Sequence, residues 1–396
     1  MRFHLAQAGI ALLLIGSLAS AQAPAPQKTK MVEEVFKNVQ ALKGISVDDF
    51  LQTMGVMSAA IGYDCAECHN NAGTDQVKWE ADDNPRKVIA RRMVRMVQAI
   101  NKDHFFNRQN VTCWTCHRGR DRPGLTPTME TVYGQGPQDP DDVLTQIPGQ
   151  PQAAQLLDKY IEAIGGAAKL AVLKSYTATG TSVGFGGFGG GATVEINAKA
   201  PDMRSTWIQF KSETGRPDAI RVTNGKTAWV KSPLAVLLEY QLTGNELAGA
   251  RLDAMLAFPG QIKTIFTGLK VSAPQSISDL PGPSSQTAAE KSTGIGQDRV
   301  VNVVQGTGPG NTLTTMYFDQ KSNLLLRVIR YTATPIGRAP TQVDLADYRD
   351  VNGVLIPFRM TFAWLDGRDA IQLDKIQANA SIPDAKFNTP ESVAGK

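Results

Sequence analysis

The sequence predicts two folded units of different class: a mainly α N-terminal domain, followed by an α+β domain with a curved antiparallel sheet, or half-barrel. Three observations predict this architecture. The 396 residues exceed the length of one average domain. Between residues 46 and 102, apolar side chains recur at helical spacing. From residue 175 onward, short runs typical of strands alternate with turn residues, and few helical patterns separate them.

Composition divides the chain further. Residues 1–21 contain Arg2, a short apolar run and an Ala19-Ser20-Ala21 cleavage site, which together indicate a signal peptide cut near Ala21. The expected segments after it are a disordered lead-in (22–30), the α domain (31–125), a linker (126–152) and the β domain (153–396). We therefore expect Sec export to the periplasm, where a peripheral association with a membrane stays open.

The charge balance excludes some classes of partner. Lysine and arginine number 41 against 37 aspartates and glutamates, so the formal charge of +4 is spread over a long chain. This balance gives no argument for a nucleic-acid partner or for a polybasic membrane arm. No later window holds about 18 continuous apolar residues, so no second membrane anchor is expected.

Three helices are predicted before residue 103. Val35, Val39 and Leu42 recur at helical spacing before Gly44 and predict a short first helix. A second helix is expected to begin at the N-cap Ser46 and to end at Gly62, and a third to begin at the N-cap Asn84 and to run to about Lys102. The apolar faces expected to be buried are Phe50, Met54, Met57 and Ile61 on the second helix, and Ile89, Met93, Met96 and Ile100 on the third.

All four cysteines of the chain lie in two copies of C-x-x-C-H. The first copy is Cys65-Ala66-Glu67-Cys68-His69 and the second is Cys113-Trp114-Thr115-Cys116-His117. In this motif the two thiols form thioether bonds to a haem, and the histidine is positioned to ligate its iron. The sequence therefore predicts two covalently bound haem c groups, one on Cys65 and Cys68 with His69, and one on Cys113 and Cys116 with His117.

Other interpretations of the cysteines stay open. Two C-x-x-C pairs can form a tetrahedral zinc site, although 44 residues separate the pairs and zinc needs no histidine after each. Structural disulfides or a thiol oxidoreductase would account for the cysteines but would leave both histidines unexplained.

Each motif follows a helix that carries two methionines three residues apart, so this region is a weak internal repeat. A thioether on such a helix can reach the face of a haem opposite the histidine. Met54 precedes Cys65 by 11 residues and Met93 precedes Cys113 by 20, and both distances allow the chain to fold back. A buried methionine more often only fills space in a core.

Charged side chains near the motifs have two interpretations each. His104, the remaining histidine after the signal peptide, is expected to be an exposed loop residue, the alternative being an axial ligand. Arg91, Arg92 and Arg95 are expected on a solvated helix face, the alternative being pairing with haem propionates.

Residues 48–123 resemble the cytochrome subunit of bacterial photosynthetic reaction centres. The segment Ala90-Arg91-Arg92-Met93-Val94-Arg95-Met96, through Ala99-Ile100-Asn101, to Val111-Thr112-Cys113-Trp114-Thr115-Cys116-His117-Arg118-Gly119 carries the resemblance. It implies Met54 as the second ligand beside His69 and Met93 as the second ligand beside His117, with Met57 and Met96 then packed against the porphyrins. Arg92 is a candidate haem contact because its guanidinium fits a propionate. That family carries four haems, whereas this chain has one pair of motifs, followed by a different domain.

The C-terminal part resembles the outer-membrane lipoprotein carrier superfamily in its expected strand order and in the turns at Tyr317-Phe318-Asp319 and Asp347-Tyr348-Arg349-Asp350-Val351-Asn352-Gly353. The resemblance implies a sheet closed over helices around an apolar cavity. One helix is expected over 153–173 and another over 247–255. Expected strands are 176–181, 192–198, 205–210, 219–223, 227–230, 299–304, 312–318, 324–331 and 355–363, and the glycine-rich run 183–191 is expected to be a hairpin tip.

These observations predict an exported dihaem cytochrome that carries single electrons between redox protein partners, one of which could be a membrane-bound complex. The alternative is an apolar-ligand carrier, for lipid or lipoprotein, with a regulatory haem module. No enzymatic activity is expected, because no Ser-His-Asp or Cys-His constellation is found. A peroxidase-like activity needs an open iron position, against which the methionines argue.

Overall fold

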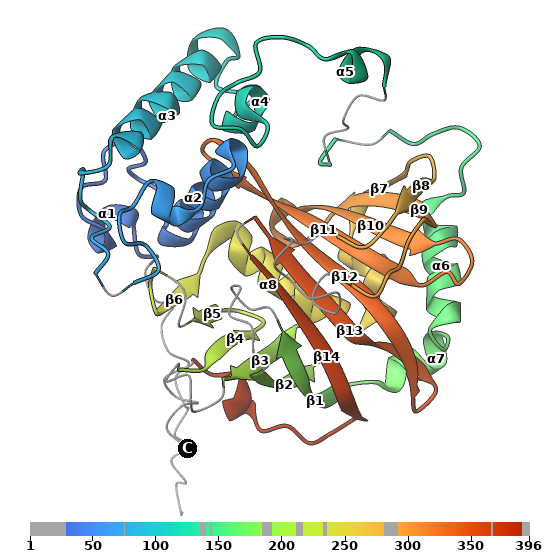
Figure 1. Ribbon diagram of the computed structural model, residues 1–396. Coiled ribbons are helices and arrows are strands. Elements are labelled where there is room, and N and C mark those ends of the chain that lie inside the picture. The colour runs from blue at the N-terminus through green and yellow to red at the C-terminus, as the bar shows by residue number, and fades with distance from the viewer. Residues whose placement is uncertain are drawn as a thin grey trace, which may run out of the picture.

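The computed structural model describes residues 29–74, 76–134, 140–142, 145–183, 192–210, 217–232, 236–280, 292–365 and 367–389. The expected signal peptide, nearly all of the lead-in and the glycine-rich run at 184–191 lie outside these ranges. The chain folds into a small group of helices that lies on one end of a large curved sheet (Figure 1). None of the helices in these ranges is long and apolar enough to cross a membrane.

The N-terminal helices are α1 (Val32–Val35), α2 (Val47–Ile61), α3 (Pro85–His104), α4 (Cys113–His117) and α5 (Met129–Tyr133), with a 3₁₀ turn η1 (Cys65–Glu67) between α2 and α3. The helix predicted from Val35, Val39 and Leu42 is wrong, because only Val35 lies in α1. Phe36 is extended and Asn38 has a left-handed φ of 60°, so the chain leaves the helix before Val39 and Leu42.

The second and third helices begin where the sequence predicts. The Ser46 hydroxyl accepts from the Asp49 amide at 3.3 Å, and Gly62 ends α2 with φ 71°. Asn84 accepts from the Arg86 amide at 3.1 Å, ahead of Pro85 at the first position of α3.

The faces that these helices bury differ from the expectation. On α2 the most buried apolar side chains are Val47, Val56 and Ala60, whereas Met54 and Met57 are only half-buried. On α3 the buried side chains are Val94, Val97 and Asn101. The stripe expected to be buried on α3 is instead open, since Ile89 is 53% and Met96 43% exposed. Both methionine-bearing faces are therefore available for further contacts.

The sheet is antiparallel, and it runs in the order β6-β5-β4-β3-β2-β1-β14-β13-β12-β11-β10-β9-β7, with β8 paired to β9. β6 and β7 are its two edges, so the half-barrel class predicted from the sequence is confirmed and the sheet is not closed. The strands are β1 (Ser175–Val183), β2 (Ala192–Lys199), β3 (Met203–Gln209), β4 (Ala219–Asn224), β5 (Ala228–Lys231), β6 (Glu239–Leu242), β7 (Thr267–Val271), β8 (Gln275–Ile277), β9 (Arg299–Thr307), β10 (Leu313–Asp319), β11 (Leu325–Thr334), β12 (Gly337–Val351), β13 (Val354–Trp364) and β14 (Gly367–Ala378).

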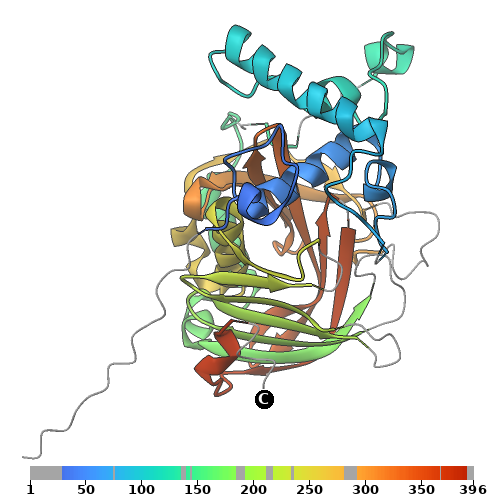
Figure 2. The ribbon, with the colours of Figure 1, turned by 90° about the vertical axis from the view of Figure 1, so that its left-hand side faces the viewer.

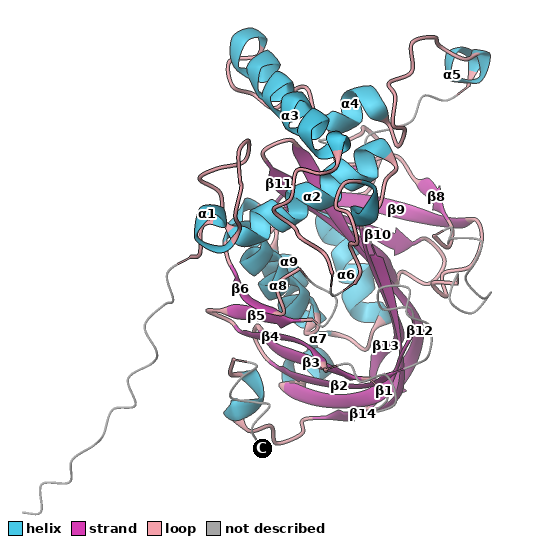
Figure 3. Ribbon diagram, turned by 60° about the vertical axis from the view of Figure 1, so that its left-hand side comes forward, coloured by secondary structure: helices cyan, strands magenta, loops and turns pink. Residues whose placement is uncertain are grey.

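Helices fill the hollow of the sheet, as Figure 3 shows for α8 and α9. They are α6 (Ala153–Ala163), α7 (Ala167–Val172), α8 (Gly244–Leu256) and α9 (Ile262–Ile265). Leu157 of α6, Leu252 of α8 and Ile262 of α9 are almost fully buried in one apolar core shared with the strands. Packing in this core keeps the sheet curved, and the N-terminal helices lie on one end of that sheet.

Two elements of this domain differ from those predicted from the sequence. The single helix expected over 153–173 is two helices, because Gly165 and Gly166 have φ of 124° and 83°. The turn expected over Asp347–Gly353 is only Asn352-Gly353, with φ of 55° and 81°, which suits a two-residue hairpin. Tyr348 to Val351 pair within the β12–β13 ladder, and Asp347, with a left-handed φ of 53°, interrupts the pairing without changing its register. The sequence did not predict β6, β7, β8, β12 and β14.

The N-terminal helices are built onto the sheet by polar and apolar contacts. Asp48 of α2, which is 3% exposed, accepts from the amide and the hydroxyl of Thr243 at 2.6 and 2.7 Å. Gly337 of the β11–β12 turn lies between Val56 and Thr112, and a Cβ there would meet Val56 at 3.0 Å. Figure 2 shows α2 between the sheet and α3. The helix that carries Met54 and Met57 is therefore the floor of the N-terminal group.

Gly165→Ala should lower the free energy of unfolding by about 2–4 kcal/mol, because only glycine tolerates φ 124° and because a Cβ would clash with the carbonyl of Gly353. Urea unfolding followed by circular dichroism measures the change. Gly124→Ala is the matched control, since no atom lies within 4 Å of its added Cβ. Equal unfolding midpoints for the two variants would contradict the account of the α6–α7 break.

Candidate functional site

The first C-x-x-C-H motif is held as one tight turn. Asp64 Oδ1 accepts from the amides of Ala66 and Glu67 at 2.8 and 3.2 Å, and so caps η1. The amide of His69 donates to the Cys65 carbonyl at 2.9 Å. Cys65, Cys68 and His69 therefore follow each other around a single helical turn.

The second motif is a five-residue helix, α4, with its own caps. The Thr112 hydroxyl accepts from the Thr115 amide at 3.3 Å, and Arg118 ends the helix with φ 51°. The amide of Gly119 donates to the Ala60 carbonyl of α2 at 2.8 Å, and the Cys113 amide donates to the Ile336 carbonyl at 3.4 Å. The second motif is thereby fixed to both α2 and the β11–β12 turn.

The two histidine rings have different surroundings: one makes a hydrogen bond to the backbone, and the other is buried. His117 Nδ1 lies 2.9 Å from the Arg120 carbonyl, to which it donates, so the lone pair of the ring is on Nε2. His69 Nδ1 is buried, and no group of the described chain makes a hydrogen bond of normal geometry with it. Burial, and then the charge of Lys87, lowers the pKa of His69. The lowered pKa favours the neutral form of His69, which is the form that binds a metal.

α3 clamps the first motif through its first two turns. Asn84 Nδ2 donates to the Glu67 carbonyl at 3.0 Å, and Arg86 pairs with the Glu67 carboxylate. Lys87 Nζ donates to the carbonyls of Trp79 and Ala81 at 2.7 and 2.6 Å. The edge of the Trp79 ring lies against His69, with centroids 5.1 Å apart.

Arg91 is not part of a solvated face. It lies 2.8 Å from Asp82 and donates to the Asn38 carbonyl at 3.2 Å. Arg91 and Asn38 hold the pKa of Asp82 well below its usual range. Arg92 and Arg95 are exposed, as predicted for a solvated face. His104 is also exposed, although it is the last residue of α3 rather than a loop residue.

The far end of α3 clamps the second motif through one side chain. Asn101, which is buried, accepts from the amides of Asn110 and Val111 at 3.0 and 2.9 Å and donates to the Val111 carbonyl at 2.7 Å. These bonds satisfy the backbone two residues before Cys113, where no regular structure could.

The methionines lie close to the second motif. Met54 and Met57 pack, half-buried, on a cluster that contains Val56, Ala60, Val94, Cys113 and Ile336. Met93 is half-buried on α3, next to Val94 of that cluster. The α2 methionines thus pack on the apolar cluster to which Cys113 of the second motif belongs.

The other interpretations of the cysteines lack support in the geometry. All four cysteines lie in the described ranges, and none of them is in a disulfide. In the same ranges, no group of three or more His, Cys, Asp or Glu side chains is placed to hold a metal ion, as a zinc site would need. Burial raises the pKa of the Cys113 thiol to about 11 and also raises that of Cys68, which opposes thiolate chemistry.

The residues present fit haem c. Two thiols and one imidazole sit together on each short turn, and His117 Nε2 is left as the donor atom. Open apolar side chains beside them, such as Met96 and the 47% exposed Trp114, suit the face of a porphyrin.

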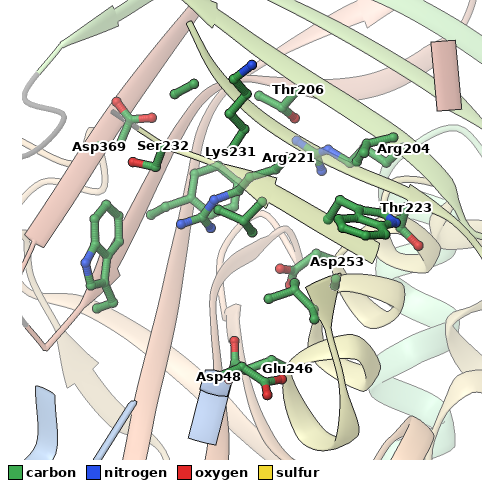
Figure 4. A pocket seen from close by; sticks show the side chains of 18 of the residues that line it. Asp48, Arg204, Thr206, Arg221, Thr223, Lys231, Ser232, Glu246, Asp253 and Asp369 are labelled. Carbon is green, nitrogen blue, oxygen red and sulfur yellow. The ribbon is translucent and has the colours of Figure 1, made fainter. Parts of the chain in front are cut away.

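The sheet domain has two adjoining cavities that the sequence analysis did not predict residue by residue. One, of about 150 Å³, lies beneath α2 and is lined by charged side chains that include Arg204, Arg221 and Asp253 (Figure 4). The other, of about 80 Å³, is mainly apolar, with Leu173, Val328 and Leu345 in its wall. These residues come from distant strands and helices, so no local pattern could have assembled them.

Comparison with known proteins matches the N-terminal part. Residues 15–143 match the family model of the photosynthetic reaction centre cytochrome C subunit. The N-terminal part of the chain is similar to a reaction-centre cytochrome c subunit. The subunit of Thermochromatium tepidum is 35% identical over 113 residues, which are 28% of this chain and 26% of that protein. Cytochrome c-554 of Chloroflexus aurantiacus is 35% identical over 86 residues, 20% of each chain.

The resemblance predicted for residues 48–123 is thus confirmed, and it supports a c-type cytochrome with covalently bound haem c. The chain spans about a quarter to a third of the length of the reaction-centre subunits it matches.

Solved structures similar to the sheet domain include a LolA superfamily protein from Nitrosomonas europaea. Its TM-score is 0.38 at 12% identity, covering 61% of this chain and all of that one. A DUF1329 family protein from Desulfovibrio piger has a TM-score of 0.39 at 10% identity, covering 60% and 98%.

Asn101→Ala should lower the free energy of unfolding by about 2–3 kcal/mol, because it removes the three hydrogen bonds that the buried Asn101 side chain makes to Asn110 and Val111. Urea unfolding monitored by tryptophan fluorescence measures it. Gln98→Ala, an exposed change on the same helix, should stay within about 0.5 kcal/mol of the parent protein. An Asn101→Ala variant as stable as the parent protein would contradict the claim that Asn101 fixes the backbone before Cys113.

Proposed function

We propose that this protein is an exported dihaem c-type cytochrome that carries single electrons between redox partners. The observation that carries the proposal is that both C-x-x-C-H turns are fixed by hydrogen bonds. Asp64 caps the first turn and Thr112 the second. The Arg120 carbonyl holds His117 Nδ1, which leaves Nε2 available. When bound, haem supplies an iron that cycles between ferrous and ferric states.

The chain's part is to attach, orient and shield each group. Cys65 and Cys68 attach the first haem, and Cys113 and Cys116 the second. His69 with Met54, and His117 with Met93, are proposed as the axial pairs. Each of these methionines lies on the helix that precedes its motif, which supports this assignment. Half-burial leaves each thioether able to turn toward a porphyrin without leaving a core, as it also does for Met57. Met57, Met96 and Arg92 are proposed haem contacts. Six-coordinate ligation keeps small molecules off the metal.

The surface around the second motif suggests the kind of partner. Residues 86–122 contain ten lysines and arginines and only two aspartates, although the whole chain carries just +4. Arg95, Lys102, Arg118 and Arg120 of this segment are exposed. Such a surface attracts an acidic partner and raises its encounter rate. We propose an acidic redox protein, or the acidic face of a membrane-bound electron-transfer complex, as the partner.

The place of action follows from the N-terminus. Residues 1–21 carry the features of a signal peptide cut near Ala21, so the mature protein is proposed to work in the periplasm, at a membrane surface or free of it.

A second candidate function is an apolar-ligand carrier with a haem module that regulates it. The apolar cavity of about 80 Å³ inside the curved sheet favours it. Organic extraction of the purified protein followed by mass spectrometry tests this function, and protein that yields no co-purified lipid would count against it.

Met93→Leu should open one iron to external ligands. Carbon monoxide should then change the visible spectrum of the reduced variant but leave the spectrum of the reduced parent protein unchanged. Met54→Leu should behave likewise, at the other haem. Met96→Leu is the matched control and should resemble the parent. Carbon monoxide binding by the parent protein, or by the Met96→Leu variant alone, would refute the axial assignment.

The rate of electron exchange with a charged reagent should depend on ionic strength if the basic surface attracts anions. Oxidation of the reduced protein by anionic ferricyanide should slow several-fold as ionic strength rises from about 0.01 to 0.15 M. Arg95→Glu with Lys102→Glu should remove most of this dependence. Lys226→Glu, an exposed change on the β4–β5 turn, should retain it. A salt dependence that is equal in both variants would rule out a steering role for this surface.

A further inference from the structure

We propose that the charged chamber beneath α2 binds a small carboxylate with a short apolar tail. The chamber lies between α2, α8 and the strands β3, β4, β5, β6, β11, β13 and β14. Its volume of about 150 Å³ is of the size that holds a benzene-sized molecule in other proteins. Figure 4 shows Arg204 and Arg221 reaching it from the sheet, with Asp48 and Asp253 on the helical side.

Arg330 supplies the strongest sign of a ligand. It is 6% exposed, it lines the chamber, and its Nε and Nη1 atoms have no hydrogen-bond acceptor within the described part of the chain. Glu246 and Asp253 lie 3.5 and 3.8 Å away, at ion-pair distance but without hydrogen-bond geometry. Buried donors of this kind are costly to leave unmet, and Arg330 therefore keeps an incompletely neutralised positive charge in the chamber wall, against Gly249 of α8.

Two further guanidinium groups favour an anion over a neutral acceptor. Arg204 lies over the Phe362 ring at 5.9 Å and Arg221 over the Trp364 ring at 5.6 Å. In the ranges described, neither has a carboxylate within 4 Å, unlike Arg330. Stacking on an aromatic face fixes a guanidinium while leaving its N–H edge free to pair with a carboxylate.

The other lining groups limit the charge and shape of the ligand. The carboxylates of Asp48, Glu246, Asp253 and Asp369 line the same space, so a monoanion is favoured over a phosphate dianion. Arg204, Asp253 and Phe362 line both cavities, so the charged chamber continues into the apolar one. A carboxylate head at the arginines therefore places its tail among Leu173, Val328 and Leu345.

The lid of the chamber belongs to the N-terminal group. Asp48 and Gln52 of α2 line the chamber, and Met54 lies on the same helix. A ligand beneath α2 and an iron held by Met54 are thus coupled through one helix, and coupling between two sites is reciprocal. An added anion favours the ferric state, so ligand binding should lower the reduction potential of the first haem. This second step rests on the proposed function, whereas the binding site does not.

Isothermal titration calorimetry on the full mature protein tests the site, with octanoate as the probe. Octanoate should bind in the micromolar to submillimolar range, and Arg204→Gln and Arg221→Gln should each weaken it at least tenfold. Arg251→Gln is the matched control, because Arg251 pairs with Asp202 and does not line the chamber. Octan-1-ol, acetate and octyl phosphate should bind at least tenfold more weakly than octanoate.

Each contrary result overturns one claim: the binding site, its preference for a carboxylate, its coupling to the haem or the proposed function. No binding of octanoate at millimolar concentration, or equal binding by Arg204→Gln and Arg221→Gln, removes the site. Octan-1-ol that binds as tightly as octanoate reduces it to an apolar cavity. A redox titration with and without octanoate tests the coupling, and an unchanged midpoint potential in protein that binds octanoate refutes it. Protein that binds octanoate but carries no haem would refute the proposed function and leave the site standing.

Discussion

The N-terminal part depends on one constraint: two sulfurs and an imidazole must be presented together by a very short piece of backbone. Five residues cannot hold such an arrangement alone, since an isolated turn pays its ordering entropy for few hydrogen bonds. The protein meets this with a side-chain cap for each turn, Asp64 for the first and Thr112 for the second. It then ties both turns to α3, through Asn84 and Asn101.

α2 joins this arrangement to the sheet domain. One side of the helix packs beside Cys113 and against the β11–β12 turn, where Gly337 leaves room for Val56. Its N-terminal turn is held by the buried pair of Asp48 and Thr243. The same turn closes the charged chamber. A change on either side of α2 therefore has a mechanical route to the other, which an unstructured connection between two domains would not provide.

The sequence could predict what local chemistry decides. The caps Ser46 and Asn84, the Gly62 helix end and ten of the strands and helices of the sheet domain follow from side chains within a few residues of each other. It could not predict which apolar stripe of α3 the protein itself covers, because both stripes have helical spacing and only the cluster that Val94 forms with Val56, Ala60 and Cys113 selects one of them. Nor could it predict the chamber, where Arg204 and Arg330 meet only after the sheet curves.

The central claim is that two haems are attached through the four cysteines. The intact mass of the mature protein, produced in a host with a cytochrome c maturation system, tests it most directly. The account predicts a mass above that of the polypeptide by two haems, falling by one haem in Cys113→Ala with Cys116→Ala and by one in Cys65→Ala with Cys68→Ala. A colourless protein with the mass of the bare polypeptide would contradict it.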